Sequence, residues 1–258
     1  KMNNARRRCR HRSKRAATLL RFSRLNRLHD RRLGCLVVHF RKHVESERET
    51  RALETGFFFD DFSPHFAADM GFISRVDQID TGAWFAPHLY SAAATWFTGI
   101  HPELFYNRTW EHGNDRYAGR LTDEVTSLET RVDLAHNGEA GARWSRRYTL
   151  FEGQAFPEQY QLRVWGSTDR WNLLRFGGAM NLGDVVIFDE TLAGRGFNYE
   201  GWVHVRPDPQ WKIELSLTGS TITRRETSVR FADDVIPRIR VQHQFTRELA
   251  LRAITELQ

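Results

Sequence analysis

Residues 211–218 read Trp-Lys-Ile-Glu-Leu-Ser-Leu-Thr, with an apolar side chain at every odd position and a polar one at every even position. Successive side chains of a β-strand point to opposite faces of the sheet, so this alternation predicts a strand with one apolar and one polar face. The same period of two recurs in residues 128–134, 160–165, 174–182, 239–245 and 249–253. Helical periodicity is scarce after residue 75, so we expect an all-β, antiparallel protein with about ten strands in that region.

Clusters of Gly, Asn, Asp and Pro separate the alternating segments. They lie at residues 112–115, 137–141, 193–196 and 207–210. These residue types supply the positive or fixed φ angles of tight turns, so the clusters predict hairpin connections. The stretch 81–102 has no charged side chain and is long enough for a membrane helix,. Its Pro, His and Thr content favours two strands joined near residues 86–88.

Two β architectures satisfy this pattern. A soluble sandwich buries the apolar faces between two sheets, whereas an outer-membrane barrel turns them to lipid and lines its lumen with the polar faces. Charges of both signs on the polar faces favour the barrel, and the absence of Cys after residue 35 fits an oxidising envelope compartment,. We also expect aromatic residues to gather at strand ends as an interfacial girdle. The residues expected there are Phe105, Tyr106, Trp110, Trp165, Trp171, Trp202 and Trp211.

The barrel interpretation assigns a side to each alternating residue. The residues expected to line a polar lumen of mixed charge are Glu129, Arg131, Arg163, Lys212, Glu214, Arg240 and Gln242. The residues expected to face lipid are Val132, Leu134, Leu215, Leu217, Val241 and Leu251. These two sets should lie on opposite faces of one sheet.

The first part of the chain has a different composition from the rest. The chain has 258 residues and a formal charge of +6, but residues 1–52 hold 17 of its 38 Lys and Arg and only 4 of its 32 Asp and Glu. We therefore divide it into an Arg-rich basic leader (1–52), expected to be irregular or partly helical, and a partial β-barrel domain (53–258). One interpretation is that residues 1–52 are a disordered, non-native leader or an out-of-frame reading of GC-rich DNA. The alternative is that they are a genuine basic tail. Cys9 and Cys35 are too few for a disulfide scaffold or a four-thiolate metal site.

Residues 61–77 contain three short blocks in order, Ser-Pro-x-Phe, Asp-x-Gly-Phe and Arg-x-Asp. Later matches are Gly183-Asp184, Phe188-Asp189, Arg206-Pro207 and the segment 245–253. Over about residues 57–258, the chain resembles the C-terminal barrel region, a domain of unknown function, of bacterial outer-membrane proteins whose N-terminal part is a carbohydrate-binding family-nine-like domain. The resemblance implies an outer-membrane β-barrel in a Gram-negative-type envelope. Members of that family carry a signal peptide and the sugar-binding-like domain upstream and further strands downstream, so we expect this chain to be a fragment with an incomplete barrel.

Motifs for catalysis are missing from the sequence. It has no nucleophile elbow, zinc-protease helix, phosphate-binding loop or calcium loop, and Lys212 is the one lysine after residue 52,. The acidic pairs at 60–61 and 233–234 are expected in hydrated turns, and adjacent strand residues point to opposite faces, so neither pair forms an acid–base dyad alone. His204, between Trp202 and Arg206, is expected to be a hydrogen-bonded lumen residue. We predict no enzyme, no cofactor and no catalytic, cofactor-binding or metal-binding residue.

The expected function is therefore that of a bacterial outer-membrane protein. The barrel would act as membrane anchor or conduit for a carbohydrate-binding-like extracytoplasmic domain, with outer-membrane lipid as its partner and carbohydrate bound through the missing domain. A nucleic-acid partner is not expected, because the basic run lacks interleaved aromatic side chains for base stacking. The alternative is a soluble β-sandwich binding module whose basic tail contacts nucleic acid or anionic lipid.

Overall fold

The computed structural model describes residues 26–27, 38–39, 41–63, 77–91, 96–112, 119–135 and 137–257. Within this part the protein is all-β, with a 13-stranded antiparallel sheet, a separate two-stranded ribbon and no helix. The dense basic run at 6–15 lies outside the described residues, as does most of the 61–77 segment that carries the family resemblance.

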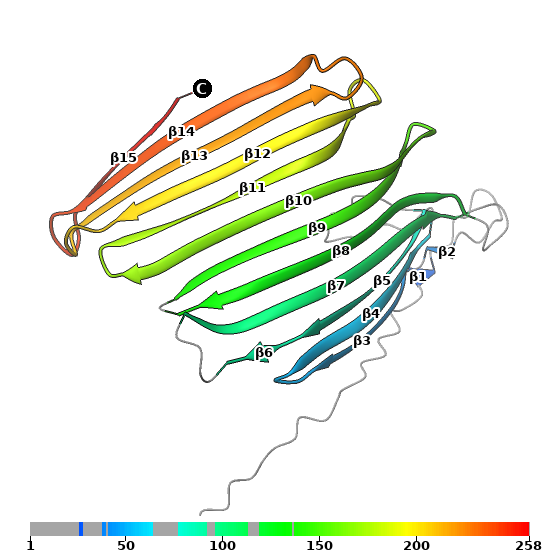
Figure 1. Cartoon of the computed structure of the whole chain (residues 1–258), viewed down its shortest axis with the longest axis horizontal. Coiled ribbons are helices and arrows are strands. Elements are labelled where there is room, and N and C mark those ends of the chain that lie inside the picture. Colours follow the sequence, from blue (N-terminus) through cyan, green and yellow to red (C-terminus); the bar gives the residue numbers. More distant parts are fainter. Residues whose placement is uncertain are drawn as a thin grey trace, which may run out of the picture.

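The strands of the large sheet follow one another in chain order (Figure 1). They are β3 (Arg41–Glu49), β4 (Leu53–Phe62), β5 (Gln78–Pro87), β6 (Leu89–Tyr90), β7 (Phe97–Glu111), β8 (Leu121–Leu134), β9 (Gly138–Phe151), β10 (Gln154–Trp171), β11 (Leu174–Ile187), β12 (Leu192–Val205), β13 (Trp211–Arg224), β14 (Arg230–Gln244) and β15 (Ala250–Glu256). The ribbon consists of β1 (Asn26–Arg27) and β2 (Val38–His39).

Each strand pairs antiparallel with its neighbours along the chain, so the sheet is a simple meander, and the short β6 joins β5 in pairing with β7. The connections alternate between two ends of the sheet. We call the end with the turns at 135–137, 172–173 and 206–210 the short-turn end. The opposite end, with the links 63–77 and 112–120, is the long-loop end.

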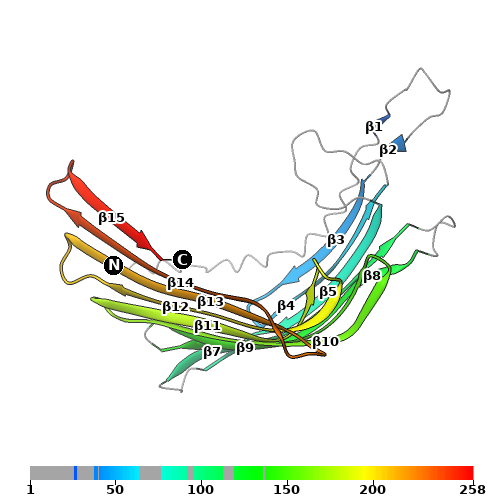
Figure 2. The ribbon, with the colours of Figure 1, turned by 90° about the horizontal axis from the view of Figure 1, so that it is seen from above.

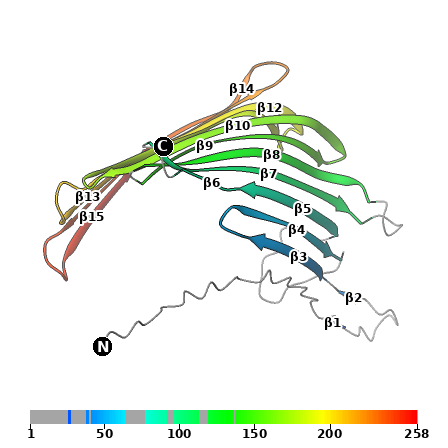
Figure 3. The same ribbon diagram turned by 60° about the horizontal axis from the view of Figure 1, so that its bottom comes forward.

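The sheet is bent into an open trough, with β3 on one rim and β15 on the other (Figure 2). A third view shows the same single layer of strands (Figure 3). Among the described residues, β3 pairs only with β4 and β15 only with β14, so the sheet is not closed. The all-β antiparallel part of the expected fold class is therefore confirmed, and these strands do not form a closed barrel.

The pairing register separates two faces of the sheet. Directly opposite residues of an antiparallel pair share a face. Leu215 stands opposite Val203 on one side and Ile239 on the other, whereas Glu214 stands opposite His204 and Arg240. Extended through all the strands, this register places every residue expected to line the lumen on one face, the polar face. Every residue expected to face lipid lies on the other, the apolar face.

The polar face is the concave side of the trough. Side chains converge and cover one another on the inside of a curved sheet, whereas they splay apart on the outside. Ser127 is 6% exposed and its neighbour Leu128 is 53% exposed; Ser145 is 5% exposed and Trp144 is 43% exposed. Because this contrast follows the alternation of faces, the apolar face is both convex and uncovered.

The glycine-rich segment 193–196 is not a turn, contrary to the sequence prediction. It lies inside β12, and the chain reverses at 188–191 instead. The glycines allow close approach of neighbouring side chains: a methyl group on Gly196 would lie 2.8 Å from Val185 Cγ1, and one on Gly194 would lie 3.0 Å from Ile187. The predicted turn at 137–141 is also displaced: the chain reverses between Leu134 and Gly138, and residues 138–141 belong to β9.

The described parts of the uncharged stretch 81–102 form strands rather than a helix, but the strands do not join at residues 86–88. The first strand runs through β5 and β6 to Tyr90, and both parts pair with β7. Pro87 has no N–H to donate to the ladder, which accounts for the interruption there. The chain reverses between Tyr90 and Phe97.

The sheet begins before the composition break at residue 52. Residues 41–49, expected to be irregular or partly helical, form β3 along the edge of β4. A free strand edge offers a row of unpaired backbone groups, which a neighbouring segment can satisfy regardless of its charge. His43 Nδ1 lies 2.8 Å from Asp60 Oδ1 across this pair.

The expected aromatic girdle is mostly wrong. Trp110, Trp171 and Trp211 lie at or next to strand ends, and Tyr106 lies mid-strand on the apolar face. The remaining three, Phe105, Trp165 and Trp202, are on the polar face.

Tryptophans on the polar face cover glycines of the adjacent strand. A methyl group on Gly141 would lie 2.2 Å from Trp165 Cζ2, and one on Gly177 would lie 2.8 Å from Trp202 Cζ2. Trp84 lies in the same way over Gly56. A glycine in a strand leaves a space above the backbone, and a flat indole from the neighbouring strand fills it.

Replacing Gly141 with valine should therefore lower the stability of the folded sheet by about 1–3 kcal/mol, because the new side chain occupies the space of the Trp165 ring. The measurement is the denaturant midpoint of the refolded protein. Adding Trp165→Ala to Gly141→Val should recover part of the loss. A midpoint unchanged by Gly141→Val would contradict the close packing of the two residues.

Candidate functional site: the polar face

Ion pairs between neighbouring strands cover much of the polar face. Glu214 Oε2 of β13 accepts a hydrogen bond of 2.9 Å from Arg240 Nη1 of β14. Within β13 itself, Glu214 Oε1 also lies 2.5 Å from Lys212 Nζ. Glu129 pairs with Arg143 across β8 and β9. Such cross-strand pairs of opposite charge stabilise a sheet while leaving a hydrated surface. The concave face is therefore suited to contact water and polar solutes.

The two signs of charge are unevenly distributed on this face. Acidic side chains predominate on β3–β8, where they include Glu45, Glu47, Glu54, Asp80, Glu103 and Glu129. Basic side chains predominate on β9–β15, where they include Arg143, Arg147, Arg163, Arg175, Arg240 and Arg252. A solute on the polar face would meet fields of opposite sign on its two sides.

A shallow hollow of about 210 Å³ lies on the basic part of the polar face. Arg143 and Arg163 stand directly opposite each other on β9 and β10, and Arg147 is nearby. Asn181 and Gln161 complete its polar lining. Arg143 pairs with Glu129, and Arg163 Nη2 lies 3.5 Å from Glu200 Oε1, so carboxylates of the same face offset part of the repulsion between the two guanidinium groups,.

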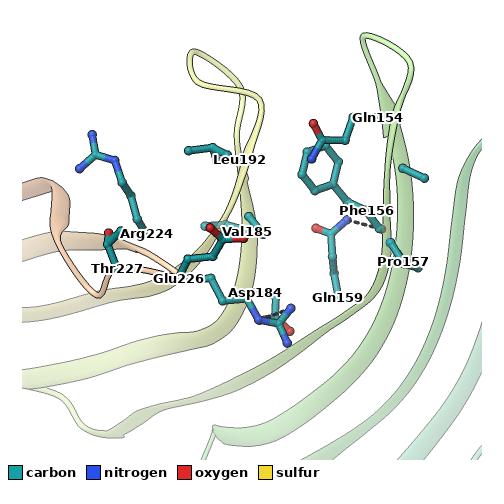
Figure 4. A pocket seen from close by; sticks show the side chains of 13 residues that line it. Gln154, Phe156, Pro157, Gln159, Asp184, Val185, Leu192, Arg224, Glu226 and Thr227 are labelled. Atoms are coloured by element: carbon teal, nitrogen blue, oxygen red, sulfur yellow. Dashed lines mark hydrogen bonds and ion pairs between the residues drawn. The ribbon is translucent and has the colours of Figure 1, made fainter.

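A second hollow of about 290 Å³ lies at the long-loop end, between β10 and the turn that follows β13 (Figure 4). Phe156 and Gln159 line one side, and Gln159 Nε2 donates a 3.0 Å hydrogen bond to the Phe156 carbonyl oxygen. Arg224 and Thr227 lie on the opposite side, with Asp184 below them in the view. This hollow can accommodate a small polar group.

An ion pair ties the 188–191 turn to the end of β13. Arg224 Nε donates a 2.7 Å hydrogen bond to Glu190 Oε2. This hydrogen bond lowers the pKa of the Glu190 carboxyl below its ordinary value. The pair therefore stabilises the folded state above the ordinary carboxyl pKa, and its contribution is lost as the pH falls through the lowered pKa.

We expect Glu190→Gln to reduce slightly the loss of stability that acid causes. At neutral and alkaline pH, the difference in stability between the variant and the unchanged protein should stay constant. Unfolding midpoints between pH 7 and pH 3, compared with those of the unchanged protein, provide the measurement. The neighbouring turn residue Asp189 offers a matched control through Asp189→Asn. An equal effect of both substitutions would argue against a specific Glu190–Arg224 pair.

Histidine–carboxylate pairs occur at three places that the sequence did not indicate. His43 lies 2.8 Å from Asp60, and His112 Nε2 lies 2.8 Å from Asp61 Oδ1. At the short-turn end, His101 Nε2 lies 2.7 Å from Asp133 Oδ2 while its Nδ1 lies 2.9 Å from His88 Nδ1. Each carboxylate orients an imidazole ring. Their sequence separations of 17 to 51 residues explain why only the strand register reveals them.

The residues singled out from the sequence lie apart from one another. His204 is on the polar face, with its ring 4.6 Å from that of Trp202. The pairs 60–61 and 233–234 lie within β4 and β14, so their expected place in hydrated turns is wrong. Hydrogen bonds to neighbouring strands accommodate these carboxylates, as Asp233 shows by accepting from Thr221 Oγ1 at 2.8 Å. The members of each pair do point to opposite faces.

In the described part of the chain, no group of three or more His, Cys, Asp or Glu is arranged to hold a metal ion. The same residues include no helix long and apolar enough to cross a membrane. No family model, curated protein or solved structure matches the chain.

Proposed function

We propose that the chain forms a large part of the wall of a bacterial outer-membrane β-barrel, with the apolar face against lipid and the polar face lining a lumen. The role is that of a membrane anchor or conduit, without enzymatic activity. The partner of the apolar face is outer-membrane lipid. The association with carbohydrate, through an extracytoplasmic domain beyond this chain, is part of the same proposal and derives from the family resemblance.

The uncovered apolar face is the observation that carries the proposal. Large apolar side chains stand half-exposed along it, including Leu104, Leu128, Met180, Leu182, Leu217 and Ile239. Water would make so extensive an exposed apolar surface unfavourable, and contiguous patches of this kind mark contacts with a membrane or a protein partner. Contact with the hydrocarbon chains of lipid removes the free-energy cost of exposing this apolar surface to water.

The alternative of a soluble sandwich lacks its second layer. Two sheets of a sandwich pack with their apolar faces inward, about 10 Å apart. The described strands from β3 to β15 form one sheet, and none of them lies over the apolar face.

The proposal can be tested with the purified chain. Refolded in the presence of phosphatidylcholine vesicles, it should co-float with the vesicles, gain β-sheet circular dichroism and resist protease. A faster migration in electrophoresis before heating than after it would add support for a folded barrel. A β-rich monomer that is soluble in buffer without detergent and does not bind vesicles would overturn the proposal.

A further inference from the structure

The apolar face has a limited height along the strands. On β11 the positions facing this side are apolar from Leu174 to Leu182, and the next one is Asp184. On β12 they run from Val205 to Phe197, and the next is Arg195. Each run spans nine residues of strand, which matches the roughly 9–11 residues of a tilted membrane-spanning strand,.

A row of charged residues closes the apolar band on the side of the long-loop end, and we call this row the charged belt. Its members are Arg108, Glu124, Arg146, Glu158, Asp184, Arg195, Arg230 and Asp233. Arg108 Nε lies 2.6 Å from Glu124 Oε2, and Arg146 Nη2 lies 3.5 Å from Glu158 Oε1. Four arginines face four carboxylates, so the belt has no net charge.

The belt crosses the sheet obliquely. A row of directly opposite residues, one on each strand, connects Asp233 of β14 with Leu128 of β8, so these two residues lie at the same height along the strands. Asp233 therefore stands four residues nearer the short-turn end than Glu124, the belt residue of β8. The border of the apolar band at the short-turn end shifts in the same direction. Ile239 of β14 lies at the same height as Leu134, the last residue of β8, but β14 continues beyond it to Val241 on the apolar face. Strands tilted against a flat slab produce this parallel shift of both borders.

We propose that the bilayer covers only the apolar band, that the charged belt lies in a layer of zwitterionic phospholipid headgroups, and that the strands beyond it stand in water as a collar at the long-loop end. This inference rests on the proposed function. Headgroups that carry both a phosphate and an amine match a belt with equal numbers of both charges. The 290 Å³ hollow, lined by Arg224 and by the belt residue Asp184, then lies where the belt meets the collar.

Two labels on one face of one strand test the position of the boundary. Leu182→Cys lies in the apolar band, and Val186→Cys lies on the same face of β11, two face positions further toward the long-loop end. Each is made in a chain with Cys9→Ser and Cys35→Ser, labelled with an environment-sensitive fluorophore and refolded into phosphatidylcholine vesicles. The quenchers are a nitroxide on the lipid acyl chain and iodide in the buffer.

The acyl-chain nitroxide should remove most fluorescence of the label at 182 and little at 186, and iodide should do the reverse. Quenching of both labels by the acyl-chain nitroxide would overturn the inference while leaving the barrel proposal intact. Iodide quenching of both labels in vesicle-bound, protease-resistant protein would also place the boundary elsewhere. Failure of the unlabelled chain to bind vesicles would overturn the proposed function, and this inference with it.

Discussion

Replacing Leu217 with arginine is expected to weaken strongly the insertion of the chain into phosphatidylcholine vesicles. Leu217 occupies the middle of the apolar band, opposite Gly201 and Pro237, and is 42% exposed. An arginine facing lipid at the bilayer midplane costs about 2–4 kcal/mol. Because the total stability of a folded domain is about 5–15 kcal/mol, this loss removes a large part of the stability of the inserted state. The measurement is the fraction of protein that co-floats and resists protease.

Thr218→Arg is the matched control, because it adds the same side chain at the next residue of the same strand. Thr218 lies on the polar face, directly opposite Glu200 of β12. A guanidinium there meets water and a carboxylate, so insertion should be nearly unchanged. Equal loss in both variants would contradict the assignment of the two faces to lipid and lumen.

Replacing Gly183 with alanine is expected to have the second large effect. Gly183 has a φ of 148°, and a methyl group on it would lie 2.1 Å from the Tyr160 carbonyl oxygen. The backbone of β10 cannot yield as a flexible side chain could. A substitution at such a position costs more than the roughly 1 kcal/mol that alanine gains where the backbone suits it.

Gly183 is also adjacent to a link between two strands. The Tyr160 amide N–H donates a 3.0 Å hydrogen bond to Asp184 Oδ2, and Gln161 Nε2 donates one of 2.9 Å to the Asp184 carbonyl oxygen. Moving the backbone at Gly183 to accommodate alanine would disturb both bonds. Denaturant unfolding of the refolded protein should therefore show a clearly lower midpoint for Gly183→Ala.

Gly201→Ala provides the comparison for this experiment. The nearest atom to a methyl group on Gly201, apart from its chain neighbours, is the Gly177 carbonyl oxygen at 4.0 Å. The substitution should be neutral or stabilising by about 0.4–1 kcal/mol, since alanine restricts the unfolded chain. If Gly183→Ala behaved like Gly201→Ala, the close approach of β10 and β11 at this point would be refuted.

Strand formation and the sorting of side chains between faces could be predicted from the sequence. Alternation in segments such as 211–218 is a local property, because the strand itself fixes which residues share a side. Leu215 and Glu214 thus lie on the opposite faces that their positions indicated. Curvature, sheet order and closure depend on contacts between segments, and the sequence pattern left the sandwich and the barrel both open.

The errors arose where a residue type has two structural uses. Glycines at 193–196 suggested a turn, but they make room for side chains of β11. Trp165 and Trp202 suggested an interfacial girdle, but they cover glycines on the polar face. A single sequence does not distinguish these uses, because the partner of each glycine or tryptophan lies on another strand.

The candidate site was predicted only as a polar surface. Its ion pairs, histidine–carboxylate pairs and hollows depend on the register between strands. His101 and Asp133 are 32 residues apart in the chain, yet their side chains are 2.7 Å apart. The charged belt was equally hidden, since Asp184 and Arg195 become neighbours only when β11 and β12 pair.

The simple chain order of the strands has a consequence for assembly. Because each strand pairs with its neighbours along the chain, closing one hairpin never requires two distant segments to meet first. Most of the connections are short, so the entropy lost in closing them is small and these local pairings form quickly,. Assembly can start at any hairpin, and further strands can then add on both sides of it. Each completed hairpin then presents a free edge that templates the addition of the next strand.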